Sequence, residues 1–252
     1  MREIPFFDQI INYQKTDSTF IRAKNLILSK DVQGNFLCIA ETQTVGKGRN
    51  DKYWFSPIGG LWMTAGFYNL PLKSSLTLYL AISIVNALIK LYPEIADNVY
   101  IKWPNDLILK NKKLGGILTS AYPNLKYILS GIGLNTNNRE FPSELNNIAI
   151  SLSEYVRKLI DNELLLYEIF NNFAEGLPDY LDNELGKLKQ LFNERFSYLK
   201  NKKVHIQTKF EELHGVAKGI NDKGALILLL ENGTFLPVYS GSVTKIDDIT
   251  II

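Results

Sequence analysis

The chain has 252 residues, of which 46% are hydrophobic and 21% are charged. These values are typical of a globular protein and exclude the disordered and fibrous classes, and the length suits one large domain or a large and a small one. The formal net charge of +2 is too small for a general nucleic-acid binder. Local clusters such as Lys110, Lys112 and Lys113 can still contact a phosphate.

Three features bear on the cellular location. Residues 1–8 carry charges and a proline where a secretory signal needs an apolar core. Residues 76–91 are apolar but are interrupted by polar side chains, so they predict a buried helix and not a membrane span. Cys38 lies in an apolar run and predicts a buried thiol, and a single cysteine excludes a disulfide within the chain. We expect a cytoplasmic protein that does not bind membranes.

The first part of the chain predicts a sheet with helices. Asp17, Ser18 and Thr19 can satisfy the free N–H groups of a first helical turn, which predicts a helix over residues 20–28. Short β-branched and aromatic runs predict strands at 36–42, 60–68, 99–103, 106–109, 116–121 and 127–132, with a hairpin turn at 110–112. Helical spacing follows from 151 to 199, with an expected break at Gly176 and Pro178. We expect the helices to cover one side of the sheet.

The pattern changes after about residue 200. Strands are predicted at 204–206, 215–220, 225–230 and 234–238, joined by short turns rich in Asn and Gly. Closely spaced hairpins of this kind make a small barrel. The sequence therefore predicts an α+β fold with two domains, a mixed sheet backed by helices in residues 1–199 and a small β-barrel in residues 200–252.

The most unusual segment is the loop of residues 43–52, in which two glycines alternate with cations directly after a strand. Glycine lets backbone N–H groups approach an anion closely, and Arg49 offers a planar fork suited to carboxylate or phosphate. Taken alone, the loop is explained equally well as a solvated surface loop. A functional interpretation requires that other candidate segments of the chain point to the same site.

Residues 102–106 read Lys-Trp-Pro-Asn-Asp, a stiff run at a strand end. Lys102 can meet a phosphate, and Asp106 can hold a magnesium ion that bridges phosphate oxygens. Trp103 can pack near a nucleotide ring. The alternative is structural, with Trp103 in the core and Asp106 capping a turn.

Two further segments carry glycines beside strands. Lys113 precedes paired glycines and shares the phase of Ile117, whereas Lys112 at a hairpin tip is expected to be solvated. Residues 130–135 read Ser-Gly-Ile-Gly-Leu-Asn, so a ligand can lie against bare backbone there. The same glycines are equally compatible with a tight sheet crossing.

These four segments, in this order and at these separations, resemble the catalytic domain of biotin–protein ligases. The resemblance covers residues 17–137 and resumes at 219–226 and 240–243. It implies the class II synthetase-like fold of biotin and lipoate ligases, joined to an SH3-like barrel. It also implies ATP, Mg²⁺ and biotin as substrates and metal. Some members carry an N-terminal DNA-binding domain, and fewer than 20 residues precede Ser18 here, so we expect a ligase without repressor activity or DNA binding.

The resemblance assigns roles residue by residue. Arg49 and Lys113 are implied as catalytic residues, Arg49 because it retains the reactive intermediate and Lys113 because it bridges the biotin carboxyl and phosphate oxygens. Asp106 is implied as the metal ligand. The implied biotin-binding residues are Ser18, Thr19, Gln43, Gly46, Lys47, Arg49, Lys113, Gly116, Leu118 and Gly131. The implied ATP-binding residues are Arg49, Lys52, Trp54, Lys102, Asn105, Lys113, Leu134 and Asn135.

Three positions depart from the family pattern. Lys47 stands where the family usually has arginine, which loses a planar fork. Phe20 replaces the asparagine of a Ser-Thr-Asn run, so a polar contact is lost or replaced. Lys52 stands at a position that is often arginine. By contrast, residues 54–57 and 102–106 match the pattern without change.

The implied reaction activates biotin as its adenylate and transfers it to a lysine of a biotin carboxyl carrier protein. The expected protein is a monomer or a homodimer. The nearest alternative is a lipoate–protein ligase, which shares the fold and the adenylate chemistry. The alternative from another class is a non-catalytic biotin- or carrier-binding module whose loop has lost its catalytic residues. This alternative is supported by Lys47, Asn50 and Asp51.

Overall fold

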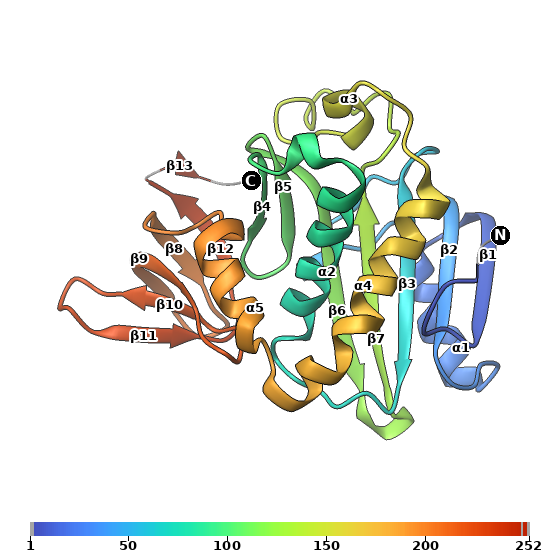
Figure 1. Cartoon of the computed structure of the whole chain (residues 1–252), viewed down its shortest axis with the longest axis horizontal. Coiled ribbons are helices and arrows are strands. Elements are labelled where there is room, and N and C mark those ends of the chain that lie inside the picture. The colour runs from blue at the N-terminus through green and yellow to red at the C-terminus, as the bar shows by residue number, and fades with distance from the viewer. Residues whose placement is uncertain (1–2, 248, 251–252) are drawn as a thin grey trace.

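The computed structural model describes residues 3–247 and 249–250, which form a large sheet with helices and a smaller sheet beside it (Figure 1). The strands of the large sheet are β1 (Gln9–Thr16), β2 (Phe36–Gln43), β3 (Leu61–Tyr68), β4 (Val99–Lys102), β5 (Asp106–Leu109), β6 (Lys112–Tyr122) and β7 (Tyr127–Leu134). Their order across the sheet is β1-β2-β3-β7-β6-β5-β4. Strands β1 and β2 are parallel and the other neighbours are antiparallel, which confirms the predicted mixed sheet.

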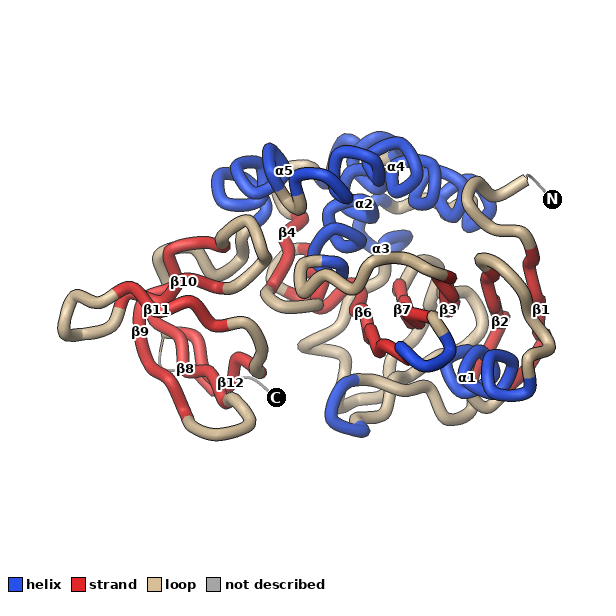
Figure 2. Tube along the Cα trace, turned by 90° about the horizontal axis from the view of Figure 1, so that it is seen from below, coloured by secondary structure: helices blue, strands red, loops and turns tan. Residues whose placement is uncertain are grey.

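Helices cover both faces of this sheet, so the prediction of helices on one side was wrong. The helices are α1 (Thr19–Ser29), α2 (Leu76–Leu91), α3 (Leu152–Val156), α4 (Asn162–Asn183) and α5 (Gly186–Leu191). Helices α2 and α4 pack together on one face, and α1 lies on the opposite face against β2, β3 and β7 (Figure 2). A second apolar cluster forms under α1 from Ala23, Ile27 and Phe36 among others, and it includes the buried Cys38.

Helix α4 runs through Gly176 and Pro178 without a break, contrary to the expectation. A Cβ on Gly176 would lie 2.8 Å from the hydroxyl oxygen of Tyr79, so the glycine allows α2 to approach α4 closely. The ring of Tyr79 stacks on that of Tyr180 at 4.3 Å between centroids. Burial of this apolar face holds the helix together despite the helix-breaking residues.

Strand β1 was not predicted from the sequence. It lies at the edge of the sheet, and most of its side chains are exposed or half-buried. A half-exposed strand is identified by alternation of polar and apolar residues, and β1, with two adjacent isoleucines and mainly polar residues after them, lacks a regular alternation.

The second sheet contains β8 (Lys203–Gln207), β9 (Glu212–Ile220), β10 (Leu226–Leu229), β11 (Phe235–Val238), β12 (Ser242–Ile246) and β13 (Ile249–Thr250). Its order is β11-β10-β9-β8-β12-β13, with every neighbouring pair antiparallel. The small C-terminal β module is thus confirmed, with β12 and β13 added to the four predicted strands. Its apolar side chains, among them Ile206 and Leu226, belong to the same core cluster as the large sheet.

Candidate active site

One cavity of about 860 Å³ gathers most of the residues singled out in the sequence. Its floor is the face of β6 and β7 near their glycines, and its rim contains the loop of residues 43–55. The small sheet closes another side with residues 207–209 and 240–244. The two ends of the cavity differ in chemistry, one being charged and the other neutral.

The charged end is centred on Asp106, the first residue of β5. Its Oδ1 lies 2.8 Å from Lys113 Nζ, and its Oδ2 lies 3.1 Å from Lys102 Nζ. Lys102 is the last residue of β4 and pairs with Asp106 across the β4–β5 hairpin, while Lys113 comes from β6 on the other side. Two ammonium groups are thus brought together around one carboxylate.

Burial and charge act in opposite directions on this carboxyl group. Burial raises the pKa of Asp106, but the ammonium groups of Lys113 and Lys102 outweigh burial and hold the pKa below its ordinary value. The Asp106 side chain is only 13% exposed. The carboxylate therefore stays ionised and keeps two cations in place inside a partly desolvated cavity.

Arg49 extends the charged end from the loop. Its Nη1 donates to Asn105 Oδ1 at 3.0 Å, and its Nη2 donates to the backbone oxygen of Gly241 at 3.0 Å. Burial lowers the pKa of Arg49, an effect that the Asp106 carboxylate opposes; guanidinium nevertheless remains charged in proteins. One side chain thus connects the loop with both the large sheet and the small one.

The loop that carries Arg49 folds back on itself. Trp54 N donates to Gly46 O at 2.9 Å, and Gly48 N donates to Lys52 O at 2.8 Å. A Cβ on Gly46 would lie 2.2 Å from the Trp54 carbonyl oxygen, so this position requires a glycine. Lys47 lies 3.8 Å from the exposed carboxylate of Asp51. The loop is therefore closed by its own backbone and presents its cations around the cavity.

Trp54 forms a wall beside Lys113, whose Nζ lies 5.1 Å from the indole centroid. A Cβ on Gly133 would come within 2.5 Å of Trp54 Nε1, so the indole rests on bare backbone of β7. Within the described residues this buried Nε1 has no hydrogen-bond partner. A buried unpaired donor in a cavity wall suits contact with a ligand acceptor.

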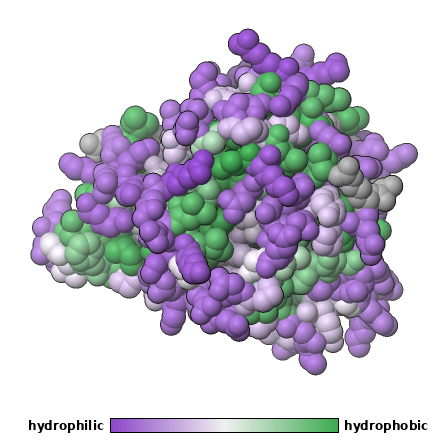
Figure 3. Space-filling model, viewed as in Figure 1, coloured by the Kyte–Doolittle hydropathy of each residue, from purple (hydrophilic) through white to green (hydrophobic). Residues whose placement is uncertain are grey.

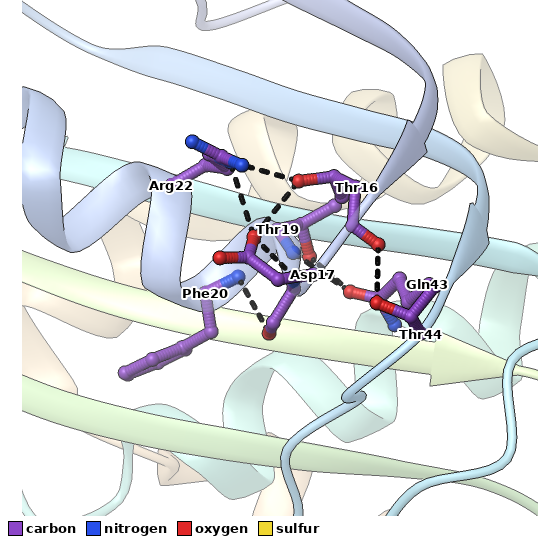
Figure 4. A network of polar contacts seen from close by, with 8 residues as sticks. Thr16, Asp17, Thr19, Phe20, Arg22, Gln43 and Thr44 are labelled. Carbon is purple, nitrogen blue, oxygen red and sulfur yellow. Dashed lines mark hydrogen bonds and ion pairs between the residues drawn. The ribbon is translucent and has the colours of Figure 1, made fainter.

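The neutral end is a cluster of buried hydroxyl and amide groups at the start of α1. Gln43 Oε1 accepts from Thr19 N at 2.7 Å and from Thr19 Oγ1 at 3.1 Å (Figure 4). Gln43 Nε2 donates to Ser56 Oγ at 2.8 Å, and the hydroxyls of Thr19 and Thr64 lie 2.9 Å apart. Ser18 caps the helix by accepting from the Phe20 backbone N–H. This polar cluster presents oriented groups that carry no charge.

Between the two ends, the cavity is lined by glycine backbone and apolar side chains. A Cβ on Gly131 would lie 3.0 Å from Phe20 Cδ2, and one on Gly116 would lie 3.5 Å from Asp106 Oδ1. Phe20, which departs from the family pattern, thus presents its ring to the cavity where an amide was expected. The middle of the cavity suits an apolar chain.

The structure brings together nearly all of the predicted site residues. Those that line the cavity are Ser18, Thr19, Gln43, Lys47, Arg49, Lys52, Trp54, Lys102, Asn105, Asp106, Lys113, Gly116, Leu118, Gly131 and Asn135. Gly46 packs against the backbone of Trp54 within the loop, and the Leu134 side chain is buried in the core. Trp103 also borders the cavity, but it is only 2% exposed and its Nε1 donates to Gly224 O at 3.0 Å, which favours the core alternative for this residue.

Two groups of lining residues were missed by sequence reasoning. One is the apolar set Phe141, Leu145, Ile148 and Ala149, and the other comes from the small sheet, namely Gln207, Thr208, Lys209 and the backbone around Gly241. The first group lies in an irregular segment whose residues 148–150 pair with the backbone of Lys113. No local pattern in the sequence signals either contact. The only available hint was the resemblance at residues 240–243.

Residues 11–137 match the model of the Biotin/lipoate A/B protein ligase family, and residues 201–245 match that of the Biotin protein ligase C terminal domain. The bifunctional ligase/repressor BirA of Bacillus spizizenii is 30% identical over 93% of this chain and 74% of its own. The biotin--[acetyl-CoA-carboxylase] ligase of Paracoccus denitrificans is 28% identical over 85% of this chain and 91% of its own.

Solved structures give the same result. The biotin protein ligase of Aquifex aeolicus, in complex with biotin and ATP, superposes with a TM-score of 0.83 at 26% identity, over 94% of this chain and 98% of the other. Fold and site together define a ligase. The chain belongs to the Biotin/lipoate A/B protein ligase family and carries its biotin protein ligase C-terminal domain.

Hydrophilic side chains dominate the face shown in Figure 3, with hydrophobic groups in smaller areas between them. In the described part of the chain, no helix combines the length and the apolarity that crossing a membrane requires.

Proposed function

We propose that this ligase activates biotin with ATP to biotinyl-5'-AMP and then transfers biotin to one lysine of a biotin carboxyl carrier protein. The observation that carries the proposal is the layout of one cavity. An uncharged polar cluster at Thr19 and Gln43 is connected, through the apolar middle part of the cavity, to a group of cations around Asp106. The Aquifex neighbour, which binds biotin and ATP together, supports the same assignment.

The first half-reaction joins two anions. An oxygen of the biotin carboxylate attacks the α-phosphorus of ATP, a P–O bond forms, and pyrophosphate leaves. Cations must offset the repulsion between the anions and stabilise the charge that develops on the phosphoryl oxygens. Lys113 and Lys102 lie close enough together to meet one phosphate group, and Arg49 and Lys52 complete the cationic surface.

The second half-reaction consumes the mixed anhydride. The uncharged ε-amino group of the carrier lysine attacks the carbonyl carbon, AMP leaves with the bonding pair, and the nitrogen loses its proton to give an amide. Water is the competing nucleophile. The folded loop of residues 43–55 encloses the place where the anhydride would lie, and Arg49 holds this loop to Asn105 and Gly241.

The neutral end suits the ureido head of biotin, which is polar but uncharged. Ser18, Thr19 and Gln43 supply the hydroxyl and amide groups, and the backbone around Gly116 and Gly131 accommodates the ring system and its chain. Placed this way, the carboxylate of biotin would extend toward Lys113 at the charged end. We propose the remaining biotin and ATP contacts as assigned by the resemblance, including backbone contacts at Gly46 and Leu134.

Mg²⁺ fits the charged end as an ion shared with ATP. This ion is usually held by one or two carboxylates together with substrate phosphates and water, and Asp106 supplies one carboxylate. When bound, it would neutralise phosphate charge. Lys102 and Lys113 share this carboxylate in the structure, so an ion at Asp106 would leave both ammonium groups to the phosphates.

We propose the ligase activity alone. The described elements are the ligase sheet, its covering helices and the C-terminal module, and the repressor function is named for the Bacillus relative. We place the enzyme in the cytoplasm, where ATP and unmodified carrier protein meet, and expect a monomer or a homodimer.

A lipoate–protein ligase is the second candidate, because the matched family includes both kinds. The match of residues 201–245 to the biotin protein ligase C-terminal domain favours biotin. The polar cluster also favours biotin, since the dithiolane ring of lipoate offers it no hydrogen-bonding group.

The test is transfer to a purified biotin carboxyl carrier domain, followed by intact-mass measurement. With ATP and biotin we expect a single added biotinyl group, lost when the acceptor lysine is replaced by arginine. With ATP and lipoate we expect no addition. Addition of lipoyl would establish the second candidate, and tight biotin binding without any modification would establish a non-catalytic binding module.

A further inference from the structure

The chain contains two histidines, and the structure places them side by side, outside the cavity. His205 lies on β8 and His214 on β9, and the two residues are direct partners in the antiparallel pairing of these strands (Figure 1). Their ring centroids are 4.1 Å apart. Two imidazoles therefore project from the same face of the small sheet.

Glu212 completes a group of three. It precedes His214 by two residues on β9, so its side chain emerges on the same face. Its Oε1 lies 3.3 Å from His205 Nδ1, and its Oε2 lies 3.8 Å from His214 Nε2. One nitrogen of each ring and one carboxylate oxygen all lie within 4.8 Å of one another.

This spacing is close to that of ligands around one transition-metal ion. Metal–ligand bonds of about 2.0–2.2 Å at tetrahedral angles place neighbouring ligand atoms roughly 3.3–3.6 Å apart. The two contacts of Glu212 lie at or near this range before any ion draws the groups together. Two imidazoles and a carboxylate are also a donor set that zinc and related divalent ions prefer over magnesium or calcium.

We propose that His205, Glu212 and His214 form a binding site for a divalent transition metal, with Zn²⁺ as the ion of best fit. Three protein ligands leave at least one position for water, which agrees with the partial exposure of the group. The site is separate from Asp106 and does not rest on the proposed biotin chemistry.

The position of the group gives the ion a structural role. Gln207 and Glu212 form the last pair before the turn of the β8–β9 hairpin, and His205 and His214 form the next pair on the same face. Residues 207–209, at the end of β8 and in the turn, line the active-site cavity. The turn is held by contacts of Thr208 with Glu211, and Phe210 at its tip is 88% exposed. An ion bound at the stem cross-links the two strands that carry this turn.

The test is calorimetric titration of the full chain, without a histidine tag, with ZnCl₂ in buffer that contains excess Mg²⁺. We expect one Zn²⁺ per chain and a rise in the unfolding temperature on binding. Loss of even an outer-sphere partner of a metal site weakens binding about 10–100-fold, so His205→Gln and His214→Gln should each weaken it at least about tenfold. Visible absorption of bound Co²⁺ should disappear in the same variants.

The matched control is Glu211→Gln, which removes the same charge as Glu212→Gln one residue away, on the turn and outside the group of three. It should leave Zn²⁺ affinity unchanged, whereas Glu212→Gln should weaken it. Circular dichroism of each variant establishes that the small sheet is folded. No saturable binding by the natural chain, or equal binding by the natural chain and both histidine variants, would overturn the proposal.

Discussion

The two ends of the candidate active-site cavity are held together by different interactions, hydrogen bonds at one end and ion pairs at the other. At the neutral end, Thr19, Gln43, Ser56 and Thr64 satisfy one another through hydrogen bonds, and all four residues are buried. At the charged end, Lys102, Lys113 and Asp106 are held by ion pairs in which one carboxylate is shared by two cations. The groups of the neutral end bond to one another, whereas the charged end holds a carboxylate where, under the proposed function, phosphate oxygens would come.

Under the proposed function, this difference assigns the uncharged head of biotin and the phosphates of ATP to separate ends of one cavity. Neutral hydrogen bonds between buried groups fix geometry at little electrostatic cost, so the neutral end can select a shape. Cations in a partly desolvated cavity are unfavourable without a counter-ion, so Asp106 offsets the charge of Lys102 and Lys113. Substitutions at the two ends should therefore affect different ligands and different steps.

The largest effect is expected for Lys113→Ala. Loss of one group that stabilises developing charge costs about 10²–10³-fold in rate, so biotin-dependent pyrophosphate release should fall by that amount. The matched control is Lys112→Ala, the neighbouring lysine, which bonds to Asn146 O outside the cavity and should leave the rate unchanged. Equal rates for the two variants would remove Lys113 from the proposed chemistry.

Asp106→Asn keeps the size of the side chain but removes the charge that both lysines share. We expect the rate of adenylate formation to fall about 10–100-fold, with partial recovery at higher Mg²⁺ if the ion site is weakened and not destroyed. Asp97→Asn changes an exposed acid near the far end of β4 and serves as the control. A magnesium titration that is the same in both variants would give Asp106 a purely structural role.

Arg49→Gly should impair retention of the adenylate more than its formation, because Lys102 and Lys113 still serve the first step. Loss of a charge-assisted hydrogen bond of about 1.5–3 kcal/mol corresponds to at least about tenfold faster escape. Escaped adenylate would acylate lysines of serum albumin, which is measured at equal adenylate formation. Arg49→Lys keeps the charge but loses the fork that reaches both Asn105 and Gly241, so it should also leak. Equal albumin labelling by the natural chain and both variants would show that Arg49 does not retain the intermediate.

The smallest effect is expected at the neutral end, for Thr19→Val. Removal of one neutral hydrogen bond, worth about 1 kcal/mol, should raise the KM for biotin about fivefold and leave the KM for ATP unchanged. Thr136→Val removes an equally buried hydroxyl that bonds to Gly59 O away from the cavity. It should cost similar stability without any change in biotin KM, and an equal rise in both variants would contradict the assignment of this end.

Much of the fold was readable from the sequence where a local pattern determines the element. Buried strands such as β3 and β7 follow from their β-branched and aromatic runs, and the start of helix α1 follows from its cap, Ser18. The exceptions are elements that depend on distant partners. Strand β1 is defined by its pairing with β2, and α4 continues through Pro178 because of its packing on α2.

The site divides in the same way. The glycine-rich loop and the run from Lys102 to Asp106 could be found because residue type and spacing carry the chemistry. The contact between Arg49 and Gly241 joins residues 192 positions apart, and no local signal announces it. Trp103 shows the reverse case, in which a motif residue beside a charged site serves the core and bonds to Gly224.

The most direct measurement of the central claim is exchange of labelled pyrophosphate into ATP in the absence of carrier protein. Exchange requires reversible formation of an acyl-adenylate, so it reports the joint use of both ends of the cavity. We predict exchange that depends on biotin, saturates with biotin and is absent with lipoate. Exchange that proceeds equally without biotin, or with lipoate in its place, would contradict the account.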